Sequence, residues 1–256
     1  MHGHLFIMLK ESLKYIPMIG PGMMFYGFIF MARNWTKDKP RLQHRLQQLK
    51  SRHKGPMSGP NDLDPMWLLL FPEGTNLSAN GRAGSAKWAE KTGIKDLQHV
   101  LLPRTTGLNF CLAELENTVE WVYDCTIAYE GIPRGQYGQD LFSLRSIYFQ
   151  GIAPKSVNMY WRRFRTTEIP INDTKAFEKW VLDRWREKDA LMEGFMQAGR
   201  FPPNPPAAKK ETRRARGAFY ETEVMQKYSL EFLLIFAPAV LIVVVALAID
   251  WLVARG

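Results

Sequence analysis

Cysteine is scarce in this sequence, and no recognisable pattern surrounds it. The 256 residues hold only two cysteines, Cys111 and Cys125, which have neither the spacing of a metal site nor enough partners for a disulfide framework. Residues 1–10 also lack the charged start and the small-residue cleavage site of a secretory signal peptide. We therefore expect both cysteines to be reduced, in a domain that faces the cytosol.

Acidic residues are outnumbered as well. Asp and Glu together number 25 against 34 Lys and Arg, which gives a formal net charge of +9. A basic balance of this kind suits anionic partners such as phosphate groups, nucleic acid or an acidic membrane face. The 46% apolar and 23% charged content allows a sizeable core and excludes wholesale disorder. The length suits one large domain, or one domain with an appendage.

Long apolar runs are confined to the C-terminal end. Residues 232–249 are uncharged and mostly apolar, and as a helix they would span about 27 Å, close to the hydrocarbon thickness of a bilayer. With Tyr228 and Trp251 at interfacial positions, the sequence predicts a transmembrane helix over residues 228–253; a buried core helix is the alternative. The preceding linker, residues 201–227, is Pro-rich and basic, which indicates the cytosolic side. Its basic cluster suits either contact with anionic lipid headgroups or plain solvation.

The first 200 residues alternate between apolar strand patterns and helical patterns. This alternation predicts an α/β class, with a sheet flanked by helices. Strands are expected at four places: residues 67–71, 99–103, 120–130 and 156–169. Trp67, Leu68 and Phe71 are expected in the core. The apolar residues 5–31, broken by Pro17, suit either a helix followed by a strand or a surface that dips into lipid.

Amphipathic segments separate these strands. Helices are expected at four places: within residues 33–52, which begin as a polar loop, and at 83–93, 107–117 and 171–199. One face of the first carries three leucines: Leu42, Leu46 and Leu49. Asn172 or Asp173 is expected to cap the last helix, and Gly199 to end it.

The stretch WLLLFPEGTNLS, residues 67–78, ends an apolar run on a carboxylate, a glycine and a hydroxyl. Pro72 stops the strand and Gly74 permits a turn. Neither explains Glu73, because a carboxylate at the mouth of a buried strand costs free energy unless something there needs it. Glu73 is therefore a candidate functional residue. Its alternative is a helix-start residue that answers the local dipole.

Several short segments resemble the glycerolipid acyltransferases, the family that includes the 1-acylglycerol-3-phosphate acyltransferases. FPEGT at residues 71–75 resembles the family's third sequence block. GFIFMAR at 27–33 is similar to its second block, which ends in an arginine, and HVLLPRTTGL at 99–108 to its fourth. Two further segments resemble the eukaryotic subgroup that includes lysocardiolipin acyltransferase: YDCTIAY (123–129) and WREKDALMEGFMQAGRFP (185–202).

The resemblance implies a glycerolipid-acyltransferase-like fold, with residues 1–200 as the acyltransferase domain. It implies transfer of a fatty acyl group from acyl-CoA, a co-substrate, to the free hydroxyl of a lysophospholipid such as lysophosphatidate, in phospholipid synthesis or remodelling. It implies no cofactor and no metal. The expected partners are acyl-CoA, the lysophospholipid and membrane lipids, and not nucleic acid. The expected location is the endoplasmic-reticulum membrane, with the domain facing the cytosol.

Five residues become candidate substrate ligands under this resemblance. Arg33 would take the acceptor's phosphate through a bidentate, charge-assisted pair; the alternative is a surface arginine that ends a strand. Glu73 would position the acceptor's glycerol hydroxyls or a basic partner. Gly74 lets the backbone approach a ligand, and with Thr75 it could donate hydrogen bonds. Lys10 is a weaker candidate for a phosphate or oxyanion contact, and its alternative is a solvated or lipid-facing lysine.

Two further positions, Arg104 and Asn76, bear on these candidate ligands. Arg104, which follows Pro103 in the fourth block, is a weaker candidate still. Asn76 stands where the family block often carries an arginine. This departure leaves the acceptor's headgroup undecided among lysophosphatidate, lysophosphatidylinositol and lysocardiolipin.

The family's catalytic block, a histidine followed five positions later by an aspartate, is absent from this chain. In the family that histidine takes the proton from the acceptor hydroxyl, and the aspartate orients the imidazole. We expect the pair upstream of residue 1, which would make the domain N-terminally incomplete. The alternative is a non-catalytic membrane protein that binds lipid or acyl-CoA, or a regulatory truncation. A nucleic-acid-binding protein is a third reading, and only YWRRFR at residues 160–165 favours it.

Overall fold

The computed structural model describes residues 4–17, 19–52, 66–203 and 221–223. The chain divides into two compact units. The first unit comprises Met1–Met8 and Asn34–Pro203, and the second comprises Leu9–Arg33 and Asn204–Gly256. The predicted transmembrane helix at 228–253 and most of the predicted linker at 201–227 lie outside the described residues.

The first unit holds most of the described secondary structure. Its helices are α2 (Trp35–Arg52), α3 (Ala79–Thr92), α4 (Thr105–Glu114), α5 (Gly138–Leu141), α6 (Leu144–Gln150) and α7 (Thr174–Ala198). Its strands are β3 (Trp67–Leu69), β4 (Trp121–Tyr129) and β5 (Val157–Arg165), the last followed by the short 3-10 helix η2 (Thr166–Glu168). Strand β1 (Leu5–Lys10) begins in this unit and ends in the second. The second unit also contains η1 (Glu11–Tyr15), α1 (Ile19–Phe25) and β2 (Ile29–Met31).

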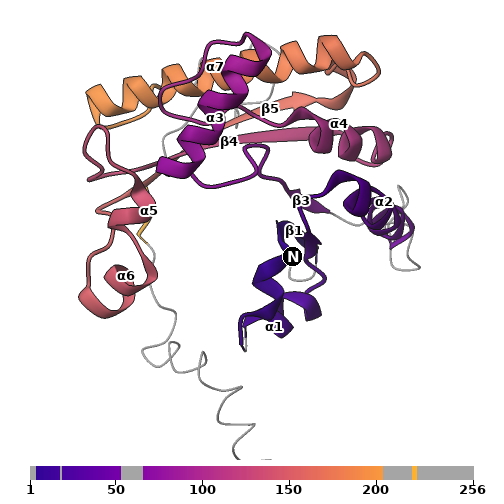
Figure 1. The fold of residues 1–256 in the computed structure, drawn as a ribbon, viewed down its shortest axis with the longest axis horizontal. Helices are drawn as coiled ribbons and strands as arrows, with labels where there is room; N and C mark the ends of the chain where they lie inside the picture. Colours follow the sequence, from indigo (N-terminus) through magenta and orange to yellow (C-terminus); the bar gives the residue numbers. More distant parts are fainter. Residues whose placement is uncertain (1–3, 18, 53–65, 204–220, 224–256) are drawn as a thin grey trace, which may run out of the picture. The chain divides into compact units, whose positions relative to one another are not determined.

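Strands β4 and β5 form an antiparallel ribbon whose pairing runs from Trp121 opposite Arg165 to Tyr129 opposite Val157. Successive side chains of a strand point to opposite faces, so alternate residues of β4 and β5 form the two faces of the ribbon. Helix α7 runs along the ribbon, and α7 and β4 are in contact (Figure 1). On the other face, side chains such as Ile127 and Trp161 stay exposed. The ribbon is therefore half covered, and its open face is available to line a site.

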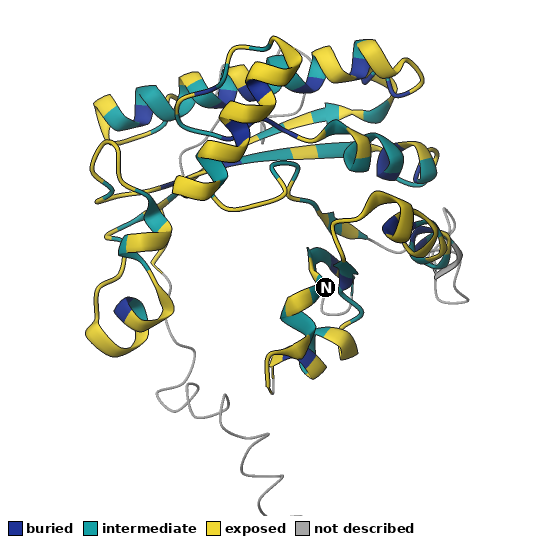
Figure 2. Cartoon of the chain, in the orientation of Figure 1, coloured by how far each residue is buried: buried dark blue, intermediate teal, exposed yellow. Residues whose placement is uncertain are grey.

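The core of the first unit lies under α7. Phe177 and Val181 on this helix are fully buried, and Trp180 packs edge-on against Phe164 of β5, with 5.2 Å between ring centroids. Full burial of a side chain such as Phe177 or Val181 stabilises the folded state by about 1.5–3 kcal/mol. The core cluster has nine members: Ala89, Leu97, Leu102, Leu112, Ile169, Ile171, Phe177, Val181 and Trp185. Alternating exposed and buried positions along α7 are visible in Figure 2.

The helices follow the local signals in the sequence. The Asp173 carboxylate accepts hydrogen bonds from the first amides of α7, and Gly199 ends the helix with a left-handed φ of 70°. Both predicted caps are confirmed. In α2 the leucine stripe is buried, with Leu42 and Leu46 at 0% exposure and Leu49 at 3%.

Strands β1 and β3 run parallel, with Leu5 opposite Trp67 and Ile7 opposite Leu69. They belong to a three-stranded sheet of which β2 is the third strand. The β4–β5 ribbon is a separate sheet. The prediction of one sheet flanked by helices is therefore wrong about the sheet, because the described residues form a mixed α/β fold with two small sheets.

The transmembrane part of the predicted fold class also needs correction. Within residues 4–17, 19–52, 66–203 and 221–223, no helix has the length and apolar character needed to cross a bilayer. The apolar run that motivated the prediction lies outside this described part. The fold class that the structure supports is mixed α/β, without a described membrane span.

Two local predictions around the central motif are wrong. Trp67 and Phe71 are not core residues, because their side chains are 46% and 56% exposed. Residues 99–103 form no strand. Side chains from α3 and α7, rather than a neighbouring strand, form hydrogen bonds with the backbone of His99 and Val100.

Candidate functional site

A cavity of about 1280 Å³ lies within the first unit. It is lined by the turn after β3, by β4, by the loop of residues 132–137 and the start of α5, and by parts of α4 and α7. Most lining side chains are apolar or aromatic, among them Trp67, Phe71 and Ile127, with a few polar groups between them. A large apolar cavity with few polar groups suits an amphipathic ligand.

Glu73 and Thr75 both line this cavity, so the predicted turn is part of its wall. The turn closes through a hydrogen bond from the Gly74 amide to the Phe71 carbonyl, 2.9 Å long. Gly74 has a φ of 70°, which a residue with a Cβ adopts only at a cost. The side chain of Arg104 lies 3.5 Å from the place a Cβ would occupy. Arg104 was among the weakest candidate ligands by sequence, yet its side chain flanks the turn.

The third and fourth sequence blocks are joined by two hydrogen bonds. Glu73 Oε2 accepts from the Leu101 amide at 3.3 Å, and the Pro72 carbonyl accepts from the Arg104 amide at 2.7 Å. The family blocks, distant in the sequence, therefore form one local structure. This arrangement is the geometric basis for treating them as a single site.

Burial raises the pKa of the Glu73 carboxyl. The Leu101 amide opposes this shift, as do the charges of Lys188 and Arg82. The buried indole Nε1–H of Trp185 forms no regular hydrogen bond among the described residues, but it lies close enough to favour the charged form too. Glu73 is thus a carboxylate kept partly out of water, which strengthens its interaction with any hydroxyl or cation that enters the cavity.

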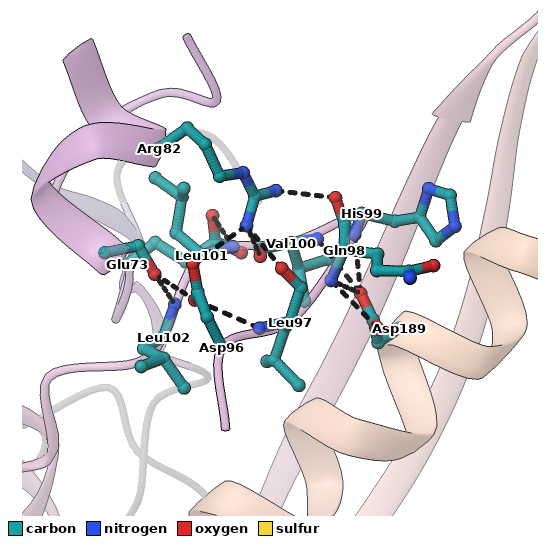
Figure 3. A network of polar contacts seen from close by, with 11 residues as sticks. Glu73, Arg82, Asp96, Leu97, Gln98, His99, Val100, Leu101, Leu102 and Asp189 are labelled. Atoms are coloured by element: carbon teal, nitrogen blue, oxygen red, sulfur yellow. Dashed lines mark hydrogen bonds and ion pairs between the residues drawn. The ribbon is translucent and has the colours of Figure 1, made fainter. Parts of the chain in front are cut away.

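The 96–102 segment, which carries Leu101, is held from two sides (Figure 3). On one side, Arg82 of α3 donates to the carbonyls of Leu97, Gln98 and Val100 at 2.5, 2.7 and 3.2 Å. On the other, the Asp189 carboxylate of α7 accepts from the amides of Gln98, His99 and Val100, the shortest at 2.6 Å. The 96–102 segment is therefore fixed by side chains, and it presents the Leu101 amide to Glu73.

Helix α7 also places a buried lysine on the cavity lining. Lys188 is 5% exposed, donates to the Cys125 carbonyl at 2.8 Å, and forms an ion pair with Asp124. Asp124 also pairs with Arg162 at 2.6 Å. The pairing satisfies a charge that would be costly if buried alone. Lys188 was not a sequence candidate, because its position in an amphipathic helix does not distinguish it from a solvated lysine.

His99 reaches the cavity lining as well. Its Nε2 lies 2.7 Å from Glu193, and Glu193 also binds Arg134 at 2.8 Å. Hydrogen bonds from Arg134, Gln197 and His99 lower the pKa of Glu193 to about 2. The partner of His99 is 94 positions away, so a search for a carboxylate five positions along cannot find it.

Both cysteines are free thiols. Burial raises the pKa of Cys111 to about 12 and that of Cys125 to about 11. Neither is a thiolate near neutral pH, so neither is an activated nucleophile. Among the described residues there is no cluster of three or more metal-ligating side chains.

The structure brings together three of the five predicted ligands. Glu73, Gly74 and Thr75 share one turn, and the Thr75 hydroxyl donates to the Asn76 side chain at 3.2 Å. Arg33 and Lys10 are exposed and belong to the second unit. Arg33 has a left-handed φ of 63°, which is unusual for a residue with a side chain. The roles of all five as substrate ligands stay predictions.

Comparison with known proteins agrees with the sequence blocks. A family model described as "Acyltransferase" matches residues 1–129, and one described as "Acyltransferase C-terminus" matches residues 148–222. A 2-acyl-1-lysophosphatidylinositol acyltransferase of Saccharomyces cerevisiae is 41% identical over 225 residues, covering 79% of this chain and 57% of that protein. Lysocardiolipin acyltransferase 1 of Gallus gallus is 33% identical over 197 residues, covering 76% and 47%.

A third relative, named "Probable 1-acyl-sn-glycerol-3-phosphate acyltransferase 5", from Arabidopsis thaliana, is 34% identical over 200 residues, covering 78% of this chain and 48% of that protein. The chain spans about half the length of the curated relatives it matches. No solved structure matches it. Together, the matched family models and relatives show that this chain belongs to the glycerolipid acyltransferase family.

Proposed function

We propose that this chain takes part in the transfer of a fatty acyl group from acyl-CoA to the free hydroxyl of a lysophospholipid. The observation that carries the proposal is Glu73 on the FPEGT turn, which lines the cavity and is tied to the fourth block through Leu101. The names of the relatives, which specify lysophospholipid acyltransferases, support the same acceptor class.

Each site residue would have a separate role in acyl transfer. In the reaction, the acceptor's hydroxyl oxygen attacks the thioester carbonyl while a base takes the hydroxyl proton. The C–S bond then breaks, and the protonated base returns that proton to sulfur, so that coenzyme A leaves as the thiol. Glu73 would accept a hydrogen bond from a glycerol hydroxyl and so orient the acceptor, with Thr75 beside it. Arg33, which belongs to the second unit, is a candidate phosphate ligand through the family resemblance alone. The apolar lining of the cavity would hold acyl chain.

A second candidate is binding of the lipid or of acyl-CoA without transfer. It is favoured by the absence, within residues 1–256, of a histidine followed five positions later by an aspartate. The cavity would serve such a protein equally well, because binding needs apolar surface and phosphate ligands but no base. Since a lysophospholipid is itself a membrane component, either function would operate at a membrane surface.

One experiment separates the two. The full chain in lipid nanodiscs is incubated with labelled oleoyl-CoA and, in turn, lysophosphatidate, lysophosphatidylinositol and lysocardiolipin, and both product and bound ligand are measured. Product that disappears in Glu73→Gln, but not in the control Glu178→Gln on the exposed side of α7, supports transfer. Binding that weakens in Glu73→Gln without any product supports the second candidate. Neither binding nor product would reject both.

A further inference from the structure

Helix α6 exposes large apolar side chains to an unusual degree. Leu144 is 75% exposed, Tyr148 73%, Phe149 86% and, just beyond the helix, Ile152 53%. Leu144 and Tyr148 are four residues apart, so they lie on the same side of the helix. In Figure 2 the helix is exposed over most of its length around one buried residue, which is Ser146. Single exposed apolar residues are ordinary, but a cluster of four marks a surface that meets something apolar.

The geometry of α6 is fixed without these side chains. Ser143 caps the helix by accepting from the Ser146 amide at 3.1 Å, and Ser146 Oγ donates to the Leu141 carbonyl at 2.7 Å. Gly151 ends the helix with a φ of 67°. The contacts that cap and end α6 therefore come from Ser143, Ser146 and Gly151, none of which belongs to the exposed apolar cluster.

The inner side of the same segment faces the cavity. Phe142, Ile147 and Pro154 belong to the cavity lining. One short stretch of chain thus has a cavity wall on one side and an exposed apolar cluster on the other. A molecule that contacts the outer cluster lies close to the cavity that the inner side encloses.

Two exposed cations flank this cluster. From Leu141 to Val157 the charged residues are Arg145 and Lys155, and both are exposed. Acidic residues adjoin this stretch at Asp140, just before it, and at Glu130, whose carboxylate accepts from the Ser156 hydroxyl at 2.8 Å. Exposed apolar and aromatic side chains with cations among them complement the boundary between anionic headgroups and acyl chains of a membrane. Tyr148 has the amphipathic ring that is enriched at that boundary.

We propose that the outer cluster of α6, comprising Leu144, Tyr148, Phe149 and Ile152, inserts into the headgroup–acyl boundary of an anionic membrane, with Arg145 and Lys155 on the headgroups. The cavity then opens beside the lipid. Only the idea that a lipid substrate passes from the membrane into the cavity rests on the proposed function. The insertion itself does not.

The test is a local one, so that binding through any other part of the chain does not obscure it. A single cysteine is introduced by Phe149→Cys in the full chain and labelled near neutral pH with an environment-sensitive nitrobenzoxadiazole dye. The native thiols have raised pKa values and react slowly, and the unsubstituted chain measures that background. Trp88→Cys is the matched control, because Trp88 is an exposed aromatic, at 50%, on α3.

Vesicles of equimolar phosphatidylcholine and phosphatidylserine are added, with and without doxyl-labelled acyl chains. We expect the dye at position 149 to shift its emission to shorter wavelength and to be quenched by the doxyl lipids, while the dye at position 88 does neither. A dye at 149 that stays as open to aqueous iodide as the one at 88, on chain that sediments with the vesicles, overturns the proposal. So does a dye at 149 that becomes shielded without vesicles as protein concentration rises, since that result assigns the cluster to a second copy of the chain.

Charge variants give an independent readout. Arg145→Gln and Lys155→Gln should each weaken quenching on the anionic vesicles about five-fold and leave it unchanged on pure phosphatidylcholine. Equal quenching on both vesicle types in the unsubstituted background would remove the electrostatic half of the proposal. These measurements use no acyl-CoA and no lysophospholipid. Insertion without acyl transfer would therefore count against the proposed function alone, and transfer without insertion would count against this inference alone.

Discussion

The Glu73 carboxylate accepts a hydrogen bond from the amide of Leu101, 28 positions further along the chain. This one contact joins the third and fourth sequence blocks at the wall of the cavity. The Glu73 carboxylate is therefore positioned by the Leu101 backbone as well as by its own turn. A substitution in either block should alter the structure of the other.

Replacement of Glu73 by glutamine should raise stability at pH 7 while it abolishes function. Burial raises the carboxyl's pKa above its ordinary value of 4.5, so the folded state holds this proton more tightly than the unfolded state does. The stability linked to the proton is present below the unfolded pKa and is lost as pH rises through the folded pKa. Glu73→Gln, which is neutral at every pH, should therefore unfold at higher urea concentration than the unsubstituted chain at pH 7, and the gain should vanish below about pH 4.

Urea unfolding at both pH values, with Glu178→Gln as the exposed control, measures this effect. A Glu73→Gln variant that is less stable at pH 7 would show that Lys188 and Arg82 more than offset the burial of the charge. Acyl transfer or ligand binding, whichever the unsubstituted chain shows, should be lost in the same variant.

Gly81 should not tolerate a side chain, whereas Gly84 on the same helix should. A Cβ on Gly81 would lie 2.7 Å from the Asn76 carbonyl oxygen, a backbone atom next to the predicted turn. Gly81→Ala should therefore destabilise the fold by about 1–3 kcal/mol. A Cβ on Gly84 meets nothing within 4 Å, so Gly84→Ala should stabilise α3 by about 0.5–1 kcal/mol. Equal effects of the two substitutions in denaturant titrations would contradict the close approach at Gly81.

Asp189 should matter more than its exposure suggests. Asp189→Ala leaves the amides of the 96–102 segment without their acceptor, at a cost of about 1–3 kcal/mol. Asp183→Ala removes only an exposed pair with Arg186 on the same helix and should cost about 0.5 kcal/mol or less. Hydrogen exchange of the Gln98, His99 and Val100 amides should accelerate in the first variant and not in the second. Unchanged exchange in both would mean that Arg82 alone holds the segment.

The hydrogen bonds of Glu193 should make the protein's stability depend on pH in the acidic range. Hydrogen bonds to Arg134 and its neighbours lower the pKa of Glu193 from 4.5 to about 2. A lowered carboxyl pKa contributes stability that is present above the unfolded pKa and is lost as pH falls toward 2. The melting temperature of Glu193→Gln should therefore lie below that of the unsubstituted chain at pH 7, and the two should converge near pH 2. Arg134→Gln should lower it similarly, and the two losses should not add in the double variant.

Arg33 offers a test of function against backbone strain. Its φ of 63° costs a residue with a Cβ roughly 1 kcal/mol, which glycine does not pay. Arg33→Gly should therefore keep or raise stability, while Arg33→Ala keeps the strain; both remove the guanidinium. If the chain transfers acyl groups, both variants should raise the KM for lysophosphatidate and leave kcat and the KM for monoacylglycerol, which has no phosphate, nearly unchanged. An unchanged KM for lysophosphatidate would assign Arg33 a structural role.

Local patterns predicted much of the secondary structure. Helix α7 with its caps at Asp173 and Gly199, the leucine stripe of α2, and strand β4 lie where periodicity and capping placed them. Strand β5 lies within its predicted segment but ends at Arg165, where η2 begins. These features depend on residues within one or two turns of each other, which the sequence shows directly. The same sequence predicted a strand at 99–103 and a buried Trp67, and both predictions were wrong. An apolar run looks the same whether it lies in a core or lines a cavity.

What the sequence by itself determined is the family, through short blocks, and the helices and long strands, through spacing and caps. What only the tertiary structure decided is how those blocks meet: Glu73 on Leu101, Asp189 and Arg82 on either side of the 96–102 segment, and His99 on Glu193. The physical reason is range. A polar group pairs with whichever partner the fold brings near it, and these partners stand 15 to 94 positions apart in the sequence, where no local pattern identifies them.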